Sequence, residues 1–226
     1  MFKYILLSIL LAVFLNSKIV HAQQTSDDMI EIGKPKLFDV KVNDAQVAFR
    51  YRFQQGDSGA ATWNSIQDKV LLDITMKFYG DRVKINMQGM TGSGFDGSWA
   101  NTGVGPQDAN FPFNLRRLSL SLGVATGVEV TAGSMAPEYG AGSEDSYLDN
   151  DGYIMGYRAK AKIENGELVV TGGFVGDFKE PNVFKRFDRM DDFNFVQAVY
   201  TRAIGEVIRA SVEYDHIDKG DYARAA

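Results

Sequence analysis

The chain has 226 residues, with 24 basic and 29 acidic side chains for a net charge of −5, and it has no cysteine. The lack of cysteine excludes a disulfide framework, a thiolate zinc site and a cysteine nucleophile. Two histidines, His21 and His216, are too few for a multi-histidine metal site, and the acidic balance is unlike that of a general nucleic-acid binder. We therefore expect no catalytic residues, no metal, no other cofactor and no nucleic-acid partner.

The first 22 residues predict a cleaved export signal. Lys3 gives a positive start, residues 4–15 are apolar apart from one serine, and Val20-His21-Ala22 is a small-residue cleavage pattern. The apolar run of about 12 residues is shorter than the roughly 20 that a transmembrane helix needs. Lys3 and Lys18 are the only charges before residue 23, so the remaining chain carries 22 basic and 29 acidic residues, a net charge of −7. Residues 23–44 show no stable period, and we expect a periplasmic lead-in there.

From residue 45 onward, apolar and polar residues alternate with a period of two, which is the pattern of half-buried β-strands. The clearest case is residues 70–78, where five apolar residues alternate with Asp73, Thr75 and Lys77 among the polar positions. A tight turn at Tyr79-Gly80-Asp81 leads into the next strand. The pattern predicts nine strands, at about residues 47–53, 70–78, 83–87, 117–122, 128–132, 153–163, 168–174, 193–201 and 208–215.

The connections between these strands alternate in length. Short ones are expected near Gly80 and at residues 125–127, 165–166 and 203–205, and long ones at 54–69, 91–112, 137–152 and 177–192. Short turns at one end and long loops at the other are typical of outer-membrane barrels. The predicted fold is therefore all-β, an antiparallel up-and-down transmembrane β-barrel.

Alternation alone does not say whether the apolar face meets lipid or a protein core. The signal, the sorted connections and the aromatic residues toward strand ends favour the membrane, where aromatic girdles form at both interfaces. These aromatic residues are Phe49, Tyr51, Phe53, Phe78, Tyr79, Tyr153, Tyr157, Phe193, Phe195 and Tyr214. The alternative is a secreted soluble β-sandwich that binds a ligand such as carbohydrate.

In a barrel, the polar face would line a lumen that is rich in basic residues. Ten basic residues fall on it, against the acidic Asp73, Glu129, Glu213 and Asp215. The predicted pore-lining residues are Arg50, Arg52, Lys77, Arg82, Lys84, Arg117, Arg158, Lys160, Lys162 and Arg209. Such an excess would favour anions. The alternative is that these cations suit a wet face and pair with acids on adjacent strands.

The segment Phe113–Gly123, followed by Val128–Gly133, resembles Gram-negative outer-membrane porins. The likeness is strongest to the phosphate-selective porin family, which has a similar strand with an arginine pair, a short turn and a return strand bearing glycine. It covers roughly residues 110–135 and carries over no selectivity residue. The resemblance implies a homotrimeric barrel in the cell outer membrane that passes small anionic solutes.

An odd strand number departs from this architecture, since such barrels have an even number with both ends in the periplasm. We therefore expect residues 45–226 to be the N-terminal part of a larger barrel. Outer-membrane lipid and lipopolysaccharide would be its surroundings, and residues 177–192 would either fold inward as a constriction or lie outside against lipopolysaccharide.

The predicted function is a porin for passive diffusion of small hydrophilic, anionic solutes, with no enzymatic activity. An adhesion or structural barrel that does not conduct is the second possibility. A barrel protease with Asp215 and His216 is disfavoured, because adjacent residues on a strand point to opposite faces.

Overall fold

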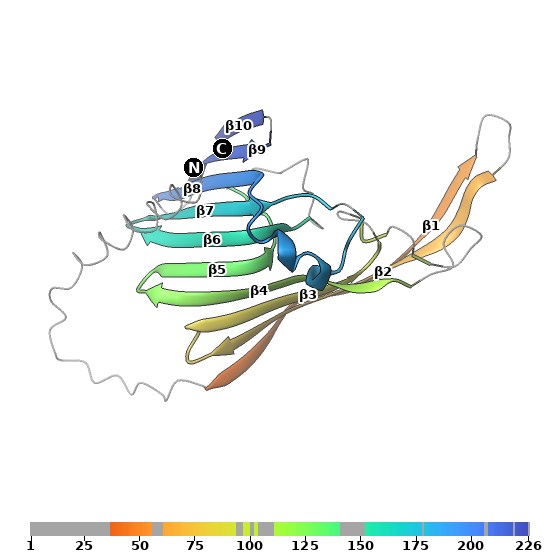
Figure 1. The fold of residues 1–226 in the computed structure, drawn as a ribbon, viewed down its shortest axis with the longest axis horizontal. Coiled ribbons are helices and arrows are strands. Elements are labelled where there is room, and N and C mark those ends of the chain that lie inside the picture. The colour runs from red at the N-terminus through yellow and green to blue at the C-terminus, as the bar shows by residue number, and fades with distance from the viewer. Residues whose placement is uncertain are drawn as a thin grey trace, which may run out of the picture.

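The computed structural model describes residues 37–55, 61–93, 97–99, 102–103, 111–140, 152–177, 179–205, 208–218 and 220–225. The predicted signal at residues 1–22 lies outside this described part of the chain. All the strands belong to one antiparallel sheet in which each strand pairs with its neighbours in sequence (Figure 1). The predicted all-β, up-and-down topology is confirmed. The sheet is open, with β1 at one edge and β10 at the other.

All nine predicted strands are present, and a tenth follows them. The strands are β1 (Phe38–Gln55), β2 (Ala61–Phe78), β3 (Val83–Thr91), β4 (Phe113–Ala125), β5 (Val128–Met135), β6 (Ile154–Ile163), β7 (Gly166–Phe174), β8 (Phe195–Ile204), β9 (Ile208–Ile217) and β10 (Gly220–Ala225). Two short 3₁₀ helices, η2 (Val183–Lys185) and η3 (Phe187–Arg189), lie in the connection between β7 and β8.

The first two strands are longer than the sequence pattern predicted. β1 begins at Phe38, so residues 38–44 belong to the sheet and not to the lead-in. β2 begins at Ala61, so the predicted long loop at 54–69 is wrong. The register of β1 shifts between Val42 and Asp44, where a β-bulge inserts one residue and breaks the simple alternation.

The connections are partly sorted by length. Short turns join β2 to β3, β4 to β5, β6 to β7 and β8 to β9 at one end of the sheet, and long loops join β3 to β4, β5 to β6 and β7 to β8 at the other (Figure 1). In the first short turn, Tyr79, Gly80 and Asp81 all have positive φ, between 52° and 70°. At the long-loop end, only residues 56–60 separate β1 from β2 and only 218–219 separate β9 from β10. The predicted sorting therefore holds for the three central long loops only.

Burial on the two faces of this sheet is the reverse of that in a water-soluble sheet. Polar side chains are buried, and apolar side chains are exposed. On β4, Ser119 and Ser121 are 6 % and 3 % exposed, whereas Leu120 between them is 43 % exposed. On β9, Glu213 is buried while Val212 is 58 % exposed. Soluble proteins bury the apolar face of a strand and expose the polar one. We call the two sides the polar face and the apolar face.

A row of glycines crosses three strands on the polar face. Gly133 of β5 pairs with Gly156 of β6, which pairs with Gly173 of β7, and the row ends at Phe195 of β8. A Cβ atom on Gly156 would lie 2.2 Å from the carbonyl oxygen of Gly172, and Gly133 has a φ of 124°. Only glycine allows this close approach and this backbone conformation. The row lies beside a small apolar cluster formed by Met135, Tyr153, Ile154, Val175 and Phe195 at the long-loop end.

Candidate channel wall and polar pocket

The polar face carries a pocket of about 240 Å³ that spans β2 to β6. Its lining is mixed in charge and rich in hydroxyl and amide groups. The lining residues are Asp73, Asn86, Met87, Gln88, Arg117, Ser119, Ser121, Glu129, Thr131, Ser134, Met135, Ala136, Arg158 and Lys160.

Hydrogen bonds between neutral side chains run across the strands of this wall. The Thr75 hydroxyl donates to Asn86 Oδ1 at 2.9 Å, and Asn86 Nδ2 donates to the Ser121 hydroxyl at 3.2 Å. The hydroxyls of Ser121 and Thr131 are hydrogen-bonded at 2.8 Å. Each strand places a polar side chain opposite a polar side chain of the next strand. Many hydrogen-bonding groups of this face are therefore paired with each other, and the face can still be wetted by water.

The loop after β5 folds back over the polar face, and we call its residues 136–140 the inner strap. Glu138 Oε2 lies 3.1 Å from Arg158 Nη1, and Glu138 Oε1 lies 3.4 Å from Lys160 Nζ. Arg158 also donates to the carbonyl of Ala136 at 2.5 Å and to the Thr171 hydroxyl at 2.9 Å. From β8, Gln197 Nε2 donates to the carbonyl of Glu138 at 2.9 Å. The strap thus reaches from β5 across to β8.

The ten predicted pore-lining residues fall into three groups on the sheet. Arg117, Arg158 and Lys160 line the pocket, and Lys84 pairs with Glu129 in its wall at 2.7 Å. Lys77, Arg82, Lys162 and Arg209 lie toward the short-turn end, where Lys77 pairs with Asp81 of the first turn at 3.0 Å. Arg50 and Arg52 lie on the part of β1 that pairs with residues 65–67 of β2.

Several of these cations are paired within the chain. Lys77, Lys84, Arg158 and Lys160 each form an ion pair with a carboxylate. Arg117 Nε donates to the carbonyl of Gly152 at 3.1 Å. Arg50 Nε donates to Gln67 Oε1 at 2.8 Å, and its guanidinium carbon lies 4.5 Å from the centre of the Trp99 ring. For these residues, the observed contacts fit the alternative in which the cations pair within the wall. They do not fit a continuous strip of uncompensated positive charge.

Two acidic residues of this site were missed by the sequence analysis. Neither Glu138 nor Glu167, which lies 3.4 Å from Lys160, was among the acids predicted for the polar face. Only two residues separate Glu138 from the end of β5 at Met135, which limits how far it can lie from the sheet. This short spacing was the available signal that Glu138 belongs to the wall.

The loop between β7 and β8 packs on the opposite, apolar face, and we call its residues 179–193 the outer strap. The ring of Phe193 stacks on that of Tyr157 with centroids 6.2 Å apart, and the Arg189 guanidinium lies 5.3 Å from the ring centre of Phe174. By register, Tyr157 and Phe174 lie on the apolar face. Figure 1 shows η2 and η3 in front of the sheet near the long-loop ends of β4 to β6. The predicted alternative of an inward constriction at residues 177–192 is therefore wrong.

A buried arginine holds the outer strap. Arg186 is 1 % exposed, its guanidinium lies 3.3 Å from the centre of the Tyr153 ring, and Nη2 donates to the carbonyl of Arg116 at 2.8 Å. The Tyr153 hydroxyl in turn donates to the carbonyl of Glu180 at 2.8 Å. Burial lowers the pKa of Arg186 to about 10. Burial also raises the pKa of the Tyr153 phenol, although the nearby charges of Arg186 and Arg116 oppose that shift.

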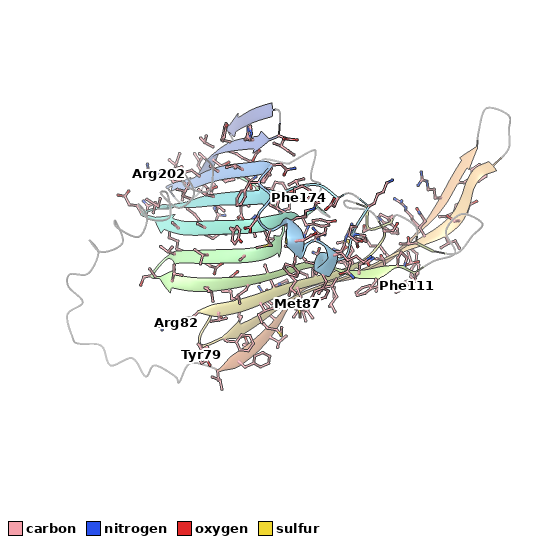
Figure 2. All side chains as sticks on the ribbon, in the orientation of Figure 1. Tyr79, Arg82, Met87, Phe111, Phe174 and Arg202 are labelled. Atoms are coloured by element: carbon pink, nitrogen blue, oxygen red, sulfur yellow. The ribbon has the colours of Figure 1, made fainter. Side chains whose placement is uncertain are left out.

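Exposed aromatic rings lie toward both ends of the sheet. Figure 2 shows Tyr79 and Arg82 near the short-turn end and Phe111 on the long-loop side. Phe38 and Phe78 pack together at the first of these ends, with ring centroids 5.1 Å apart, and Phe111 stacks on Phe113 at the other. Not all the predicted girdle residues face outward: Tyr79 is 62 % exposed, whereas Tyr153 and Phe195 are buried.

Asp215 and His216 occupy opposite faces of β9, since Asp215 pairs with Gln197 and His216 with Val196. Within the described residues, no helix is long and apolar enough to cross a membrane. No protein-family model matches this chain, and no curated protein sequence matches it.

Proposed function

We propose that this chain forms the wall of an outer-membrane channel of the porin type, through which small hydrophilic solutes diffuse passively. The observation that carries the proposal is the inverted burial of the sheet, with Ser119 and Ser121 buried and Leu120 exposed on the same strand. In a bilayer, an exposed apolar face contacts lipid and a polar face lines an aqueous interior. An open, up-and-down antiparallel sheet is also what part of such a barrel forms.

A preference for anions is the second part of the proposal. Arg82, Lys162 and Arg209 are exposed toward the short-turn end, where they would give one mouth of the channel a positive potential. In the pocket itself, Arg117, Arg158 and Lys160 are accompanied by Asp73 and Glu129. Selectivity would therefore arise at the mouth and from those pocket cations that a solute can reach.

The inner strap gives one specific reason to consider a second function. A strap that crosses from β5 to β8 reduces the open space above the polar face. A barrel plugged in this way would serve adhesion or structure and would not conduct. A homotrimer embedded in lipopolysaccharide, as the porin resemblance implies, is compatible with either function.

Single-channel recording separates the two. The full-length protein, reconstituted in a planar bilayer under a salt gradient, should give stable current steps and a reversal potential on the anion side. Stable membrane insertion without conductance would favour the plugged barrel. Recovery of the protein in the soluble periplasmic fraction, with no insertion, would contradict both membrane functions.

A charge on the apolar face tests the contact with lipid. Leu120→Arg should lower the free energy of unfolding in micelles or bilayers by about 2–4 kcal/mol if Leu120 lies near the bilayer midplane. Thr201→Arg is the control, because Thr201 lies on the polar face opposite Glu167, where an arginine can pair. Equal effects of the two substitutions would contradict the assignment of faces.

A further inference from the structure

The carboxylate of Glu138 occupies a site that has the chemistry of an oxyanion receptor. Arg158 Nη1 and Lys160 Nζ approach its two oxygens from β6, at 3.1 Å and 3.4 Å. A guanidinium and an ammonium that converge on one carboxylate form a charge-assisted pair of contacts, which a carboxylate or phosphate of a solute could make equally well. The occupant here is a side chain of the protein itself.

The receptor groups are held independently of this occupant. Arg158 Nε is fixed by the Thr171 hydroxyl of β7 at 2.9 Å, and Lys160 has a second carboxylate, Glu167, at 3.4 Å. Both cations also stand on the same face of one strand, two residues apart. Their positions are therefore set by the sheet, and loss of the Glu138 carboxylate should leave them in place.

The occupant, in contrast, is held on a loop at the edge of the pocket. The Glu138 side chain is 26 % exposed and that of Lys160 is 32 % exposed, so water reaches this ion pair. An ion pair in contact with water is weak and exchanges readily with other ions. Glu129, by comparison, lies within strand β5 and pairs with Lys84 on β3.

We propose that Arg158 and Lys160 form a binding site for small oxyanions, and that Glu138 masks this site as an internal competitor. Glu138 is then a specificity-determining residue, because its carboxylate opposes the entry of solutes that carry carboxylate or phosphate groups. This inference rests on the proposed channel function for its physiological meaning, but the site can be tested by binding alone.

The inner strap should keep its position when the charge of Glu138 is removed. The test therefore reports on the charge alone. The strap backbone is held at Ala136 by Arg158 and at Glu138 by Gln197, and neither contact uses the Glu138 carboxylate. Glu138→Gln keeps the size of the side chain and removes only its charge. Asp192→Asn is a matched control, since it removes one negative charge from the outer strap on the other face of the sheet.

The first experiment is calorimetric titration of acetate and of inorganic phosphate into the full-length protein in uncharged detergent micelles. Glu138→Gln should bind at least one of the two anions at least about threefold more tightly than the wild type, because one unit of negative charge within a few ångströms is removed. Asp192→Asn should bind like the wild type. Equal binding by all three proteins, or equal gains in both variants, would overturn the proposal.

The second experiment works on channels that are already folded. The 226 residues contain no cysteine, so Glu138→Cys provides a thiol at this position for modification in the bilayer. A reagent that adds a sulfonate should lower the anion-to-cation permeability ratio, and a neutral reagent of similar size should leave it high. Equal effects of the two reagents would overturn the assignment of Glu138. Absence of current with unmodified wild type, together with tighter oxyanion binding by Glu138→Gln, would reject the channel and retain the binding site.

Discussion

The two straps leave the same end of the sheet and lie on opposite faces, and each is attached by the chemistry of the face on which it lies. The inner strap is attached by ion pairs and hydrogen bonds, from Glu138 to Arg158 and Lys160 and from Gln197 to the strap backbone. The outer strap is attached by ring contacts, with Phe193 on Tyr157 and Arg186 on Tyr153. Each strap thus carries side chains that match the chemistry of the face on which it lies.

The two straps differ most clearly in the groups that surround an arginine, Arg158 at the inner strap and Arg186 in the outer strap. Arg158 is neutralised by a carboxylate at 3.1 Å. Arg186 is buried against a ring at 3.3 Å and a carbonyl at 2.8 Å. A ring face and a carbonyl compensate a buried cation less completely than a carboxylate does. Burial, together with the nearby charge of Arg116, lowers the pKa of Arg186 to about 10.

The largest expected effect is loss of the sheet that lies between the two straps. Gly156→Val would place side-chain atoms against the carbonyl oxygen of Gly172, where even a Cβ would lie at 2.2 Å. The backbone has no room to move without breaking the pairing of β6 with β7, so we expect a loss of more than about 3 kcal/mol. The check is the yield of folded protein by heat-dependent mobility on detergent gels. Ala159→Val on the same strand is the control, and equal loss there would show that β6 tolerates no added volume at all.

The second largest effect comes from two substitutions that each destabilise one strap and not the other. Arg158→Gln should destabilise the inner strap by about 2–3 kcal/mol, because it removes the charge-assisted hydrogen bond to the Ala136 carbonyl together with the ion pair to Glu138. Arg186→Gln should destabilise the outer strap by less, about 1–2 kcal/mol, because losing a poorly compensated buried charge offsets part of the lost contacts. Hydrogen exchange followed by mass spectrometry should show release of residues 136–140 in the first variant and of 183–189 in the second. Release of both straps in either variant would mean that they are coupled.

A smaller effect depends on pH and is confined to the outer strap. Tyr153→Phe removes the hydrogen bond to Glu180 and should cost about 1 kcal/mol near pH 8. Burial raises the pKa of Tyr153 in the folded protein, whereas an unfolded tyrosine ionises near pH 10. The contribution of the phenol is therefore complete below pH 10 and declines as the pH rises further. The difference in unfolding free energy between wild type and Tyr153→Phe should shrink above pH 10, and a constant difference up to pH 11 would contradict the burial of the phenol.

The smallest effect is a difference in sensitivity to salt. Raising the ionic strength from about 0.1 M to 1 M shortens the Debye length from about 10 Å to 3 Å. The partly exposed ion pairs of Glu138 should weaken, so that exchange at residues 136–140 increases a few-fold. Exchange at residues 183–189 should stay constant, because stacking and buried contacts are little screened. The opposite order would reverse the comparison of the two straps.

The alternating faces could be predicted from the sequence because they depend only on neighbouring residues. Ser119, Leu120 and Ser121 illustrate this, since their positions on the two faces follow from the geometry of a strand. The number of strands was also accessible, apart from the short β10. Turn positions were less accurate: the turn expected at residues 165–166 lies at Glu164 and Asn165, because Glu164 adopts a φ of 47° and Gly166 already pairs with Ile163.

The placement of the straps could not be predicted from local patterns. The outer strap depends on contacts such as that between Arg186 and Arg116, which are 70 positions apart. The placement of the inner strap depends on the ion pairs of Glu138 with Arg158 and Lys160, which lie on β6, beyond a long loop. The bulge at Asn43 is likewise set by pairing with β2, so the start of β1 was missed.

The length of the first hairpin has a consequence for what lies beyond the bilayer. β1 and β2 have 18 residues each, and Figure 1 shows them extending past the ends of the other strands. A strand of that length spans about 60 Å, whereas about 9–11 tilted residues suffice to cross the hydrocarbon region. With the long-loop end facing out of the cell, as in outer-membrane barrels, roughly 25 Å of this ribbon would stand above the outer leaflet. Molecules approaching the cell would then meet these outer parts of β1 and β2 before they reached the channel mouth.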